Sequence, residues 1–319
     1  MRRASRPRFL WLGLLGLGLL SAPHVLGDYH RYILTEILMW GLFALGFDII
    51  FGKTGLLNFG MSSFFGLGGY GLVWAVHHFG ANIWLGLLAA MVLTMAFSCL
   101  LGMLVTRFGS HYFVVFSIIA STILFLLAMN QRWLTGADEG INIRLKKVPM
   151  IFADLSLNDP LVKYYLVLGI TALAFWAILR FFDSPVGRAI ESIKHNEKRA
   201  EMLGYDTRVL KLIAFTLSGT VAGLAGGLYP VLNSNANAGL FFWLLSGNAI
   251  LWTVVGGAGT LWGCFLGTSI LVLVEDTLSS WMVDLYPILI GVLLILVIIL
   301  APKGILGSLQ DHLRKKSGH

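Results

Sequence analysis

The sequence predicts an all-α membrane protein, a polytopic bundle of about ten (eight to ten) transmembrane helices with both termini in the cytoplasm. Of its 319 residues, 57% are hydrophobic and only 12% are charged, against roughly 25% charged in a soluble domain. The apolar runs are continuous and about 18 residues or longer, which is the length of a spanning helix. Outer-membrane barrels are excluded, because their strands alternate polar and apolar residues.

The apolar runs divide the chain into ten expected spans. They cover residues 9–26, 31–51, 61–79, 83–106, 112–130, 161–181, 210–231, 240–257, 261–279 and 284–301. With a cytoplasmic N-terminus, 17 of the 23 Lys and Arg residues fall on the inner side. This excess supports the orientation, because cytoplasmic loops are enriched in basic residues. Two hydrophilic segments are long, one outside at 131–160 and one inside at 182–209.

No low-complexity linker divides the chain, so we expect one membrane domain. Residues 1–30 are a basic N-terminal segment and the first helix, 31–307 are the transmembrane domain with its inner loop 182–209, and 308–319 are a cytoplasmic tail. The run Phe9–Leu20 also resembles a signal peptide. Because no clean Ala-x-Ala cleavage site follows it, an uncleaved helix is favoured.

Two motifs resemble nucleotide sites but fail in their context. Residues 66–71 (GLGGYG) fit G-x-G-x-x-G, yet they lie in a helix-length apolar run and not between a strand and a helix. Gly52-Lys53-Thr54 resembles the end of a P-loop, but Phe47 stands where a glycine is required. We expect no catalytic residue, cofactor or metal in this chain. If transport is driven by ATP, another subunit must bind it.

The segment 52–71 is too rich in glycine for a comfortable lipid-facing helix. Irregular backbone at membrane depth is tolerated only where protein or a water-filled cavity surrounds it, and broken helices line the substrate route in many transporters. The segment therefore predicts part of a translocation path, with a buried structural helix as the alternative. The predicted path residues are Asn58, Ser62, Ser63, Ser117 and Ser121.

Two glycine series recur at four-residue spacing and predict close helix packing. They are Gly219, Gly223 and Gly227, and Gly259, Gly263 and Gly267. Such a face either packs statically or slides during a conformational cycle.

The inner loop predicts two short helices. Ser184 can cap the first and Pro185 can occupy its first position. An apolar stripe follows at Val186, Ala189, Ile190 and Ile193. Asn196 can cap a second helix that extends to residues 202–203, with Gly204 at its C′ position. The stripe can lie in the lipid interface or in the groove of a partner, and its mixed charges favour a partner. We therefore expect charges at Ile190 and Ile193 to uncouple ATP hydrolysis from transport.

Several stretches together resemble the LivM-type permease family of ABC importers for branched-chain amino acids. The resemblance covers roughly residues 32–307. It rests on 54–60 (TGLLNFG) with 64–70 (FFGLGGY), on 135–140 (TGADEG), on 184–190 (SPVGRAI) with Glu197, Ala200, 203–204 (LG) and 211–215 (KLIAF), on 255–263 (VGGAGTLWG), and on 301–305 (APKGI). Family members usually have Ser in place of Asn58 and His or Gln near Met61.

The resemblance implies a non-catalytic permease subunit in a bacterial plasma membrane. Its partners would be a homologous second permease, two cytoplasmic ATPase subunits that hold ATP and Mg, and an extracytoplasmic binding protein, without nucleic acid. The inner loop would couple to the ATPase through Pro185, Gly187, Arg188, Ile190, Ile193, Glu197, Ala200 and Gly204. The substrate would be a branched-chain amino acid. Alternatives are urea or short amides, a self-sufficient secondary transporter, and a membrane anchor of an enzyme complex.

Overall fold

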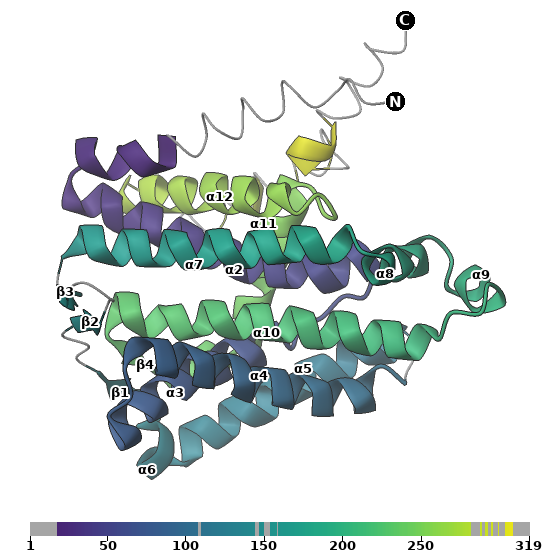
Figure 1. Cartoon of the computed structure of the whole chain (residues 1–319), viewed down its shortest axis with the longest axis horizontal. Coiled ribbons are helices and arrows are strands. Elements are labelled where there is room, and N and C mark those ends of the chain that lie inside the picture. Colours follow the sequence, from purple (N-terminus) through teal and green to yellow (C-terminus); the bar gives the residue numbers. More distant parts are fainter. Residues whose placement is uncertain are drawn as a thin grey trace, which may run out of the picture.

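Six long apolar helices form the frame of the protein in a computed structural model (Figure 1). It describes residues 18–107, 110–143, 147–149, 154–157, 159–281, 288, 291–292, 295, 299 and 304–308. The six helices are α2 (Asp28–Thr54), α4 (Ile83–Val105), α5 (Ser110–Asn130), α7 (Pro160–Phe182), α10 (Thr207–Asn233) and α12 (Trp262–Trp281). Each can cross a hydrocarbon core of about 30 Å. The expected polytopic helical fold is confirmed.

Shorter elements complete the described part of the chain. The helices are α3 (Met61–Phe79), α6 (Arg132–Thr135), α8 (Pro185–His195), α9 (Glu197–Met202), α11 (Trp243–Gly256) and the 3-10 helix η1 (Ala238–Phe241). The strands are β1 (Ile141–Asn142), β2 (Lys147–Pro149), β3 (Asp154–Ser156) and β4 (Asn235–Ala236). β1 pairs antiparallel with β4, and β2 pairs antiparallel with β3.

α10 lies between α2 on one side and α3 and α4 on the other (Figure 1). Its glycines bring helix backbones into direct contact. A Cβ on Gly68 of α3 would lie 1.9 Å from the carbonyl oxygen of Gly223, and a Cβ on Gly226 would lie 1.9 Å from that of Phe65. The close packing predicted for Gly219, Gly223 and Gly227 is therefore confirmed. The second series is not one helix face, because Gly259 lies in the loop between α11 and α12. The G-x-G-x-x-G motif lies within α3, where it serves this contact.

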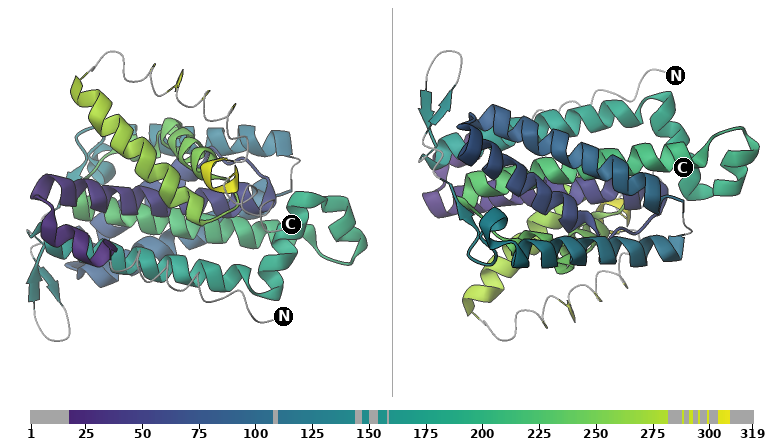
Figure 2. Two further views of the ribbon diagram at one scale, coloured as in Figure 1. Left: turned by 90° about the horizontal axis from the view of Figure 1, so that it is seen from above. Right: turned by 90° about the horizontal axis from the view of Figure 1, so that it is seen from below.

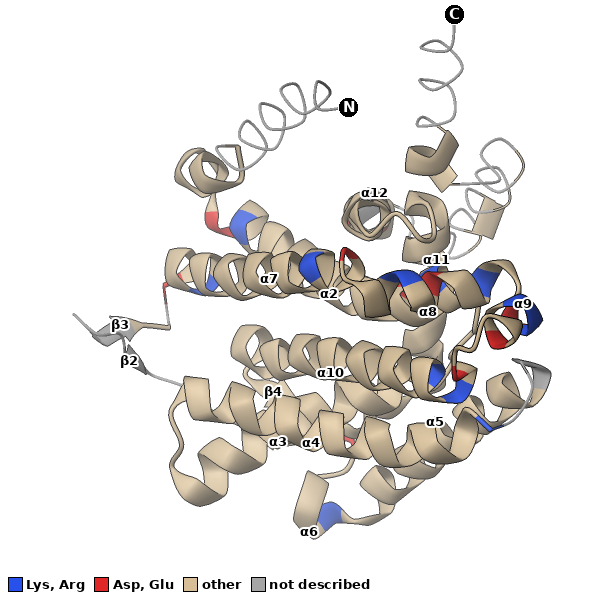
Figure 3. Ribbon diagram, turned by 45° about the vertical axis from the view of Figure 1, so that its right-hand side comes forward, with Lys and Arg blue, Asp and Glu red and all other residues tan. Residues whose placement is uncertain are grey.

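The two ends of the bundle differ. One end, which we call the basic end, carries α8 and α9 beyond the ends of the long helices, and the strands β2 and β3 lie at the other end (Figure 2). Lys and Arg residues are concentrated in α8, α9 and the start of α10 (Figure 3). The segment that was expected to be inside, 182–209, is thus separated by the bundle from the segment expected outside, 131–160.

Most expected spans match helices, but one is wrong. Residues 240–257 are not a single span, because the chain runs through β4 and η1 and becomes α-helical only at Trp243. Backbone bonds explain the break: β4 pairs with β1, and Ala238 N–H donates to the carbonyl of Ala137. Hydropathy cannot reveal such long-range bonds. The spans 9–26 and 284–301 lie mainly outside the described residues, of which 18–25 are helical.

Candidate functional site

The first break in the membrane helices joins α2 to α3. α2 ends at Gly55, whose φ of 79° is left-handed, and α3 does not start until Met61. Asn58 Oδ1 accepts the N–H of Gly60 at 2.8 Å, which closes a tight turn. Phe59 N–H donates to Ser117 Oγ at 3.1 Å, some ten ångströms into α5 from the basic end. The turn therefore folds back into the bundle, as the glycine-rich segment predicted.

The second break precedes α11 and reaches the same depth from the opposite end. α10 ends at Ser234 (φ 58°), and β4 and η1 follow before α11 begins at Trp243. α11 has 14 residues and rises about 21 Å, so it covers only part of the membrane. The described chain therefore contains two non-helical connections that enter the bundle, and irregular backbone at membrane depth is tolerated where protein or a water-filled cavity surrounds it.

The two breaks meet in a cluster that we call the serine seam, made of Ser62, Ser121, Ser246 and the Phe241 carbonyl. Ser62 Oγ lies 2.7 Å from Ser121 Oγ, and both hydroxyls donate to the Phe241 carbonyl, at 3.1 and 2.6 Å. Ser62 N–H donates to Ser246 Oγ at 2.8 Å. All three serines have no exposed surface. The seam joins α3, α5, η1 and α11 near the midpoint of α5.

The structure brings the five predicted path residues together. Asn58, Ser62, Ser63, Ser117 and Ser121 are all buried around the first break. Ser63 Oγ has no hydrogen-bond partner among the described residues. Hydroxyls without a nearby base or metal favour polar binding over chemistry, and opening the seam would free them for a passing polar group.

Two members of the seam escaped sequence reasoning. Ser246 and the Phe241 carbonyl fall in residues 240–257, where one continuous helix was expected and its carbonyls would be satisfied internally. Just before this stretch, Asn235, Asn237 and Gly239 are turn-forming residue types close together. This was the signal that could have revealed the break.

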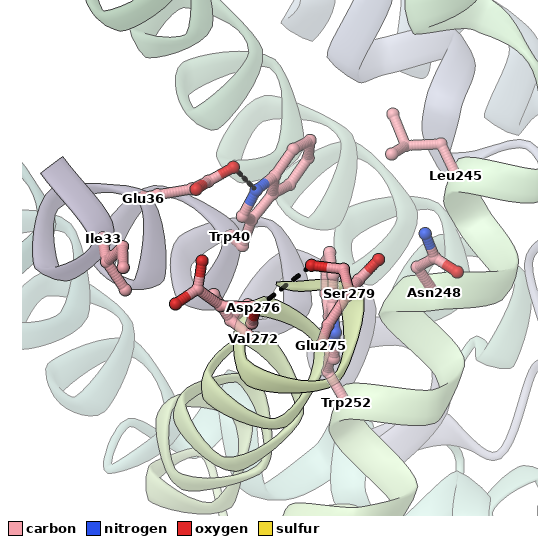
Figure 4. Close-up of a pocket in the computed structure, with 10 residues that line it drawn as sticks. All are labelled: Ile33, Glu36, Trp40, Leu245, Asn248, Trp252, Val272, Glu275, Asp276 and Ser279. Atoms are coloured by element: carbon pink, nitrogen blue, oxygen red, sulfur yellow. Dashed lines mark hydrogen bonds between the residues drawn. The ribbon is translucent and has the colours of Figure 1, made fainter. Parts of the chain in front are cut away.

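A cavity of about 310 Å³ opens on another part of the bundle, between α2, α11 and α12 (Figure 4). Trp40 and Trp252 contribute aromatic walls. Three carboxylates also line it, from Glu36, Glu275 and Asp276. Two of these are already bonded: Trp40 Nε1 donates to Glu36 at 3.1 Å, and Tyr29 hydroxyl donates to Asp276 at 2.5 Å. The lining carries no basic residue, so the cavity attracts cations over anions.

At the basic end, α8 and α9 form a short hairpin. Ser184 Oγ accepts the N–H of Gly187 at 3.2 Å, and Pro185 occupies the first turn, as the sequence predicts. Asn196 Oδ1 caps α9 by accepting the N–H of Arg199 at 3.0 Å. Gly204 follows α9 with φ 88°. The predicted helices and caps are confirmed.

The apolar stripe of α8 faces the protein's own core, which corrects the expectation of a lipid or partner contact. Ile190 is fully buried, and Gly187, Ala189 and Ile193 are buried too, because α8 packs on α2, α7 and α10. Ala200 of α9 is also buried. A partner cannot reach these side chains in this state. Of the predicted coupling residues, those left accessible are Pro185, Arg188 and Gly204, with Glu197 partly exposed.

The accessible apolar surface lies instead at the tip of the hairpin. Met202 and Leu203 are 81% and 71% exposed, and Tyr205 is 47% exposed. Arg199 and Lys198 border them. Since exposed large apolar side chains grouped together mark interaction sites, this tip is the part of the hairpin suited to a protein partner.

No ligand set for a metal ion is present among the described residues. His77 and His78 lie with ring centroids 5.1 Å apart at the end of α3. Adjacent histidines on a helix point to different faces, which suits a surface pair better than a shared ligand site.

Comparison with known proteins decides the family. The family described as the permease component of branched-chain amino acid transport systems matches residues 30–298. The chain belongs to this permease family. It is 26% identical to the branched-chain amino acid permease LivM of Escherichia coli K12, over 90% of this chain and 72% of the relative.

Further relatives of this permease are also permease proteins of branched-chain amino acid transport systems. It is 24% identical to BraD of Pseudomonas aeruginosa and 24% identical to LivH of E. coli K12, each over 84% of this chain and 91% of the relative. A ribose import permease of Haemophilus influenzae matches over 44% of this chain. No solved structure gives a significant match. The permease is thus a multi-pass membrane protein related to transport subunits.

Proposed function

We propose that this permease is one of two membrane subunits of an ABC importer in a bacterial plasma membrane, and that it carries branched-chain amino acids. The observation that supports this most is the family match over residues 30–298 together with two non-helical connections that meet in the middle of the bundle. Relatives of both the LivM and LivH type suggest a pair of homologous permeases. The basic end is then cytoplasmic.

In this proposal the serine seam is part of the closed path. The hydroxyls of Ser62 and Ser121 contact each other and the Phe241 carbonyl, the Ser246 hydroxyl accepts the Ser62 N–H, and together they exclude water from the centre of the bundle. When α3 and α11 separate, these groups exchange their mutual bonds for bonds to a passing amino acid. Asn58 is held by Gly60 and by a contact of its Nδ2 with Met61 Sδ at 3.3 Å. The two departures from the usual family residues thus support each other at the first break.

The permease hydrolyses no ATP itself in this proposal. Two cytoplasmic ATPase subunits bind ATP and Mg, and the hairpin tip at Met202, Leu203 and Tyr205 docks in a groove of one of them. An extracytoplasmic binding protein delivers the substrate. Closure of the ATPase pair then favours one of two arrangements of the permease, because the ATPase binds them with different affinity.

Reconstitution tests the proposal. The permease is placed in vesicles with its second permease, ATPase and binding protein, and uptake of radiolabelled leucine is measured. We expect uptake only with internal ATP and with all partners present. Uptake by this chain alone, driven by a proton or sodium gradient, would show a secondary transporter instead. Competition by urea or acetamide, but not by isoleucine or valine, would replace the amino acid by a short amide.

A further inference from the structure

Asp48 is a carboxylate that the path and the hairpin do not account for. It lies on α2, about two turns before the first break, and has no exposed surface. Its Oδ1 accepts the N–H of Gly259 at 2.6 Å and its Oδ2 accepts the N–H of Leu261 at 3.2 Å. Buried carboxylates are expensive unless hydrogen-bonded, so this residue and the loop it contacts stabilise each other.

The loop of residues 257–261, which joins α11 to α12, depends on that carboxylate. Gly257, Gly259 and Leu261 all have left-handed φ angles, of 120°, 90° and 56°. Leu261 is strained in this region because of its Cβ. Two charge-assisted bonds from neighbouring amides to one carboxylate offset such strain. The loop also lies against α2, since a Cβ on Gly259 would be 2.9 Å from the carbonyl oxygen of Gly52.

The hairpin is bonded to the same place. Lys194 of α8 donates from Nζ to the carbonyl of Gly52 at 2.7 Å, and its Nζ would lie 3.3 Å from a Cβ on Gly259. Glu191 of α8 pairs with Lys53 at 2.6 Å. α8 therefore holds the end of α2 directly and touches the loop, while Asp48 joins the end of α2 to that loop.

Each of the two joined parts leads to one break. The end of α2 continues into residues 55–60 and then into Ser62, while the loop is the basic-end terminus of α11, which carries Ser246. We propose that Asp48 is a positioning residue of the transport cycle. It joins the end of α2 to the loop 257–261, so that movement of α8 reaches Ser62 and Ser246 of the serine seam together. This proposal rests on the proposed function, because it assigns the transmission of the ATPase movement.

A native thiol reports on this joint without any partner. Cys264 lies at the start of α12, three residues after Leu261, and is fully buried. The chain has one other cysteine, Cys99. In a Cys99→Ala background, Cys264 should react slowly with N-ethylmaleimide. Asp48→Ala should raise its labelling rate about tenfold or more, because local opening becomes easier when two buried bonds are lost.

The conservative variant Asp48→Asn separates the loss of hydrogen bonds from the loss of side-chain volume. Asp48→Asn keeps one acceptor oxygen of nearly the same shape, so labelling of Cys264 should lie between the wild-type and Asp48→Ala rates. Unchanged protection in Asp48→Ala would overturn the proposal, since the α2–loop contact would then not depend on the carboxylate.

The second measurement is the number of ATP molecules hydrolysed per leucine transported by the full complex in vesicles. We expect Asp48→Ala and Lys194→Met to raise this ratio about fivefold or more, the lower bound for a coupling of ordinary strength. Lys163→Met is the matched control, because Lys163 also donates to a backbone carbonyl, that of Leu232 at 3.2 Å, but at the opposite end. Its ratio should stay at the wild-type value.

The outcomes are distinguishable. A normal ratio in both Asp48→Ala and Lys194→Met overturns this inference and leaves the proposed function standing. Absence of ATP-driven uptake by the wild-type complex overturns the proposed function, and the labelling of Cys264 still decides whether Asp48 holds the loop. If Asp48→Ala fails to assemble, Lys194→Met decides the coupling ratio, because Lys194 is an exposed residue whose loss removes one bond and buries no charge.

Discussion

The two helices of the hairpin at the basic end have opposite relations to the rest of the molecule. α8 buries its apolar side chains against α2, α7 and α10, whereas α9 buries Ala200 and leaves Met202 and the following Leu203 in solvent. The difference shows that an amphipathic stripe predicts that a helix face will be buried. It does not predict whether the protein's own core, lipid or a partner buries it. In the proposed function, α8 transmits the movement of the ATPase because it packs on the bundle, and the hairpin tip binds the ATPase because its apolar side chains are exposed.

The largest expected effect tests the buried side of this comparison. Ile190→Asp places a carboxylate at a fully buried position of α8. We expect destabilisation by more than about 4 kcal/mol and loss of folded protein. Size-exclusion chromatography and thermal melting in detergent measure it. Val186→Asp is the control, because Val186 belongs to the same predicted stripe but is 41% exposed, and it should melt as the wild type does.

If Ile190→Asp folded normally and only lost transport, the stripe would face a partner after all, as the sequence alone suggested. The expectation that charges here uncouple transport is thus replaced by an expectation of lost folding.

A backbone contact gives the next effect. A Cβ on Gly187 would lie 2.4 Å from the Cα of Phe182 and 2.5 Å from the carbonyl oxygen of Phe181, and neither atom can move without shifting the end of α7. We expect Gly187→Ala to destabilise by about 1–3 kcal/mol, as overpacking does. Gly169→Ala in α7 is the control, since a Cβ there meets nothing within 4 Å. Equal melting temperatures for the two variants would contradict the close docking of α8 on α7.

The exposed side is tested by charge at the hairpin tip. Met202→Asp combined with Leu203→Asp should change the free energy of unfolding by less than about 0.5 kcal/mol, because both side chains are in solvent. Binding to the ATPase should weaken about thirtyfold, the effect of losing one buried interface anchor of about 2 kcal/mol. Co-purification and a binding titration of the purified proteins measure this affinity. Trp133→Asp, 82% exposed at the opposite end, is the control. Unaltered ATPase binding in the double variant would move the docking surface away from the tip.

Local rules predicted the hairpin better than tertiary rules could. The caps at Ser184 and Asn196 depend on neighbouring backbone groups, so sequence sufficed for them. The buried stripe, the break before α11 and the bonds of Asp48 depend on contacts with other helices and strands, and those of Asp48 reach residues over two hundred positions away in the chain. The glycine-rich composition of residues 52–71 indicated only roughly that Asn58 and the four path serines lie at one depth. It missed Ser246, because hydropathy reads 240–257 as one span.

The smallest effects come from the helix caps, and they distinguish α8 from α9 by how much each helix depends on its cap. Ser184→Ala and Asn196→Ala each remove one side-chain bond to a helix N-terminus, to Gly187 and Arg199, which costs about 1 kcal/mol. α8 is held by its packing and should keep its shape, so Ser184→Ala should lower the melting temperature slightly and leave ATPase binding unchanged. α9 has six residues and little packing, so Asn196→Ala should fray it and weaken ATPase binding about threefold without a change in melting. Amide hydrogen exchange of residues 197–203 measures the fraying, and equal exchange in both variants would mean that α9 is held by something other than its cap.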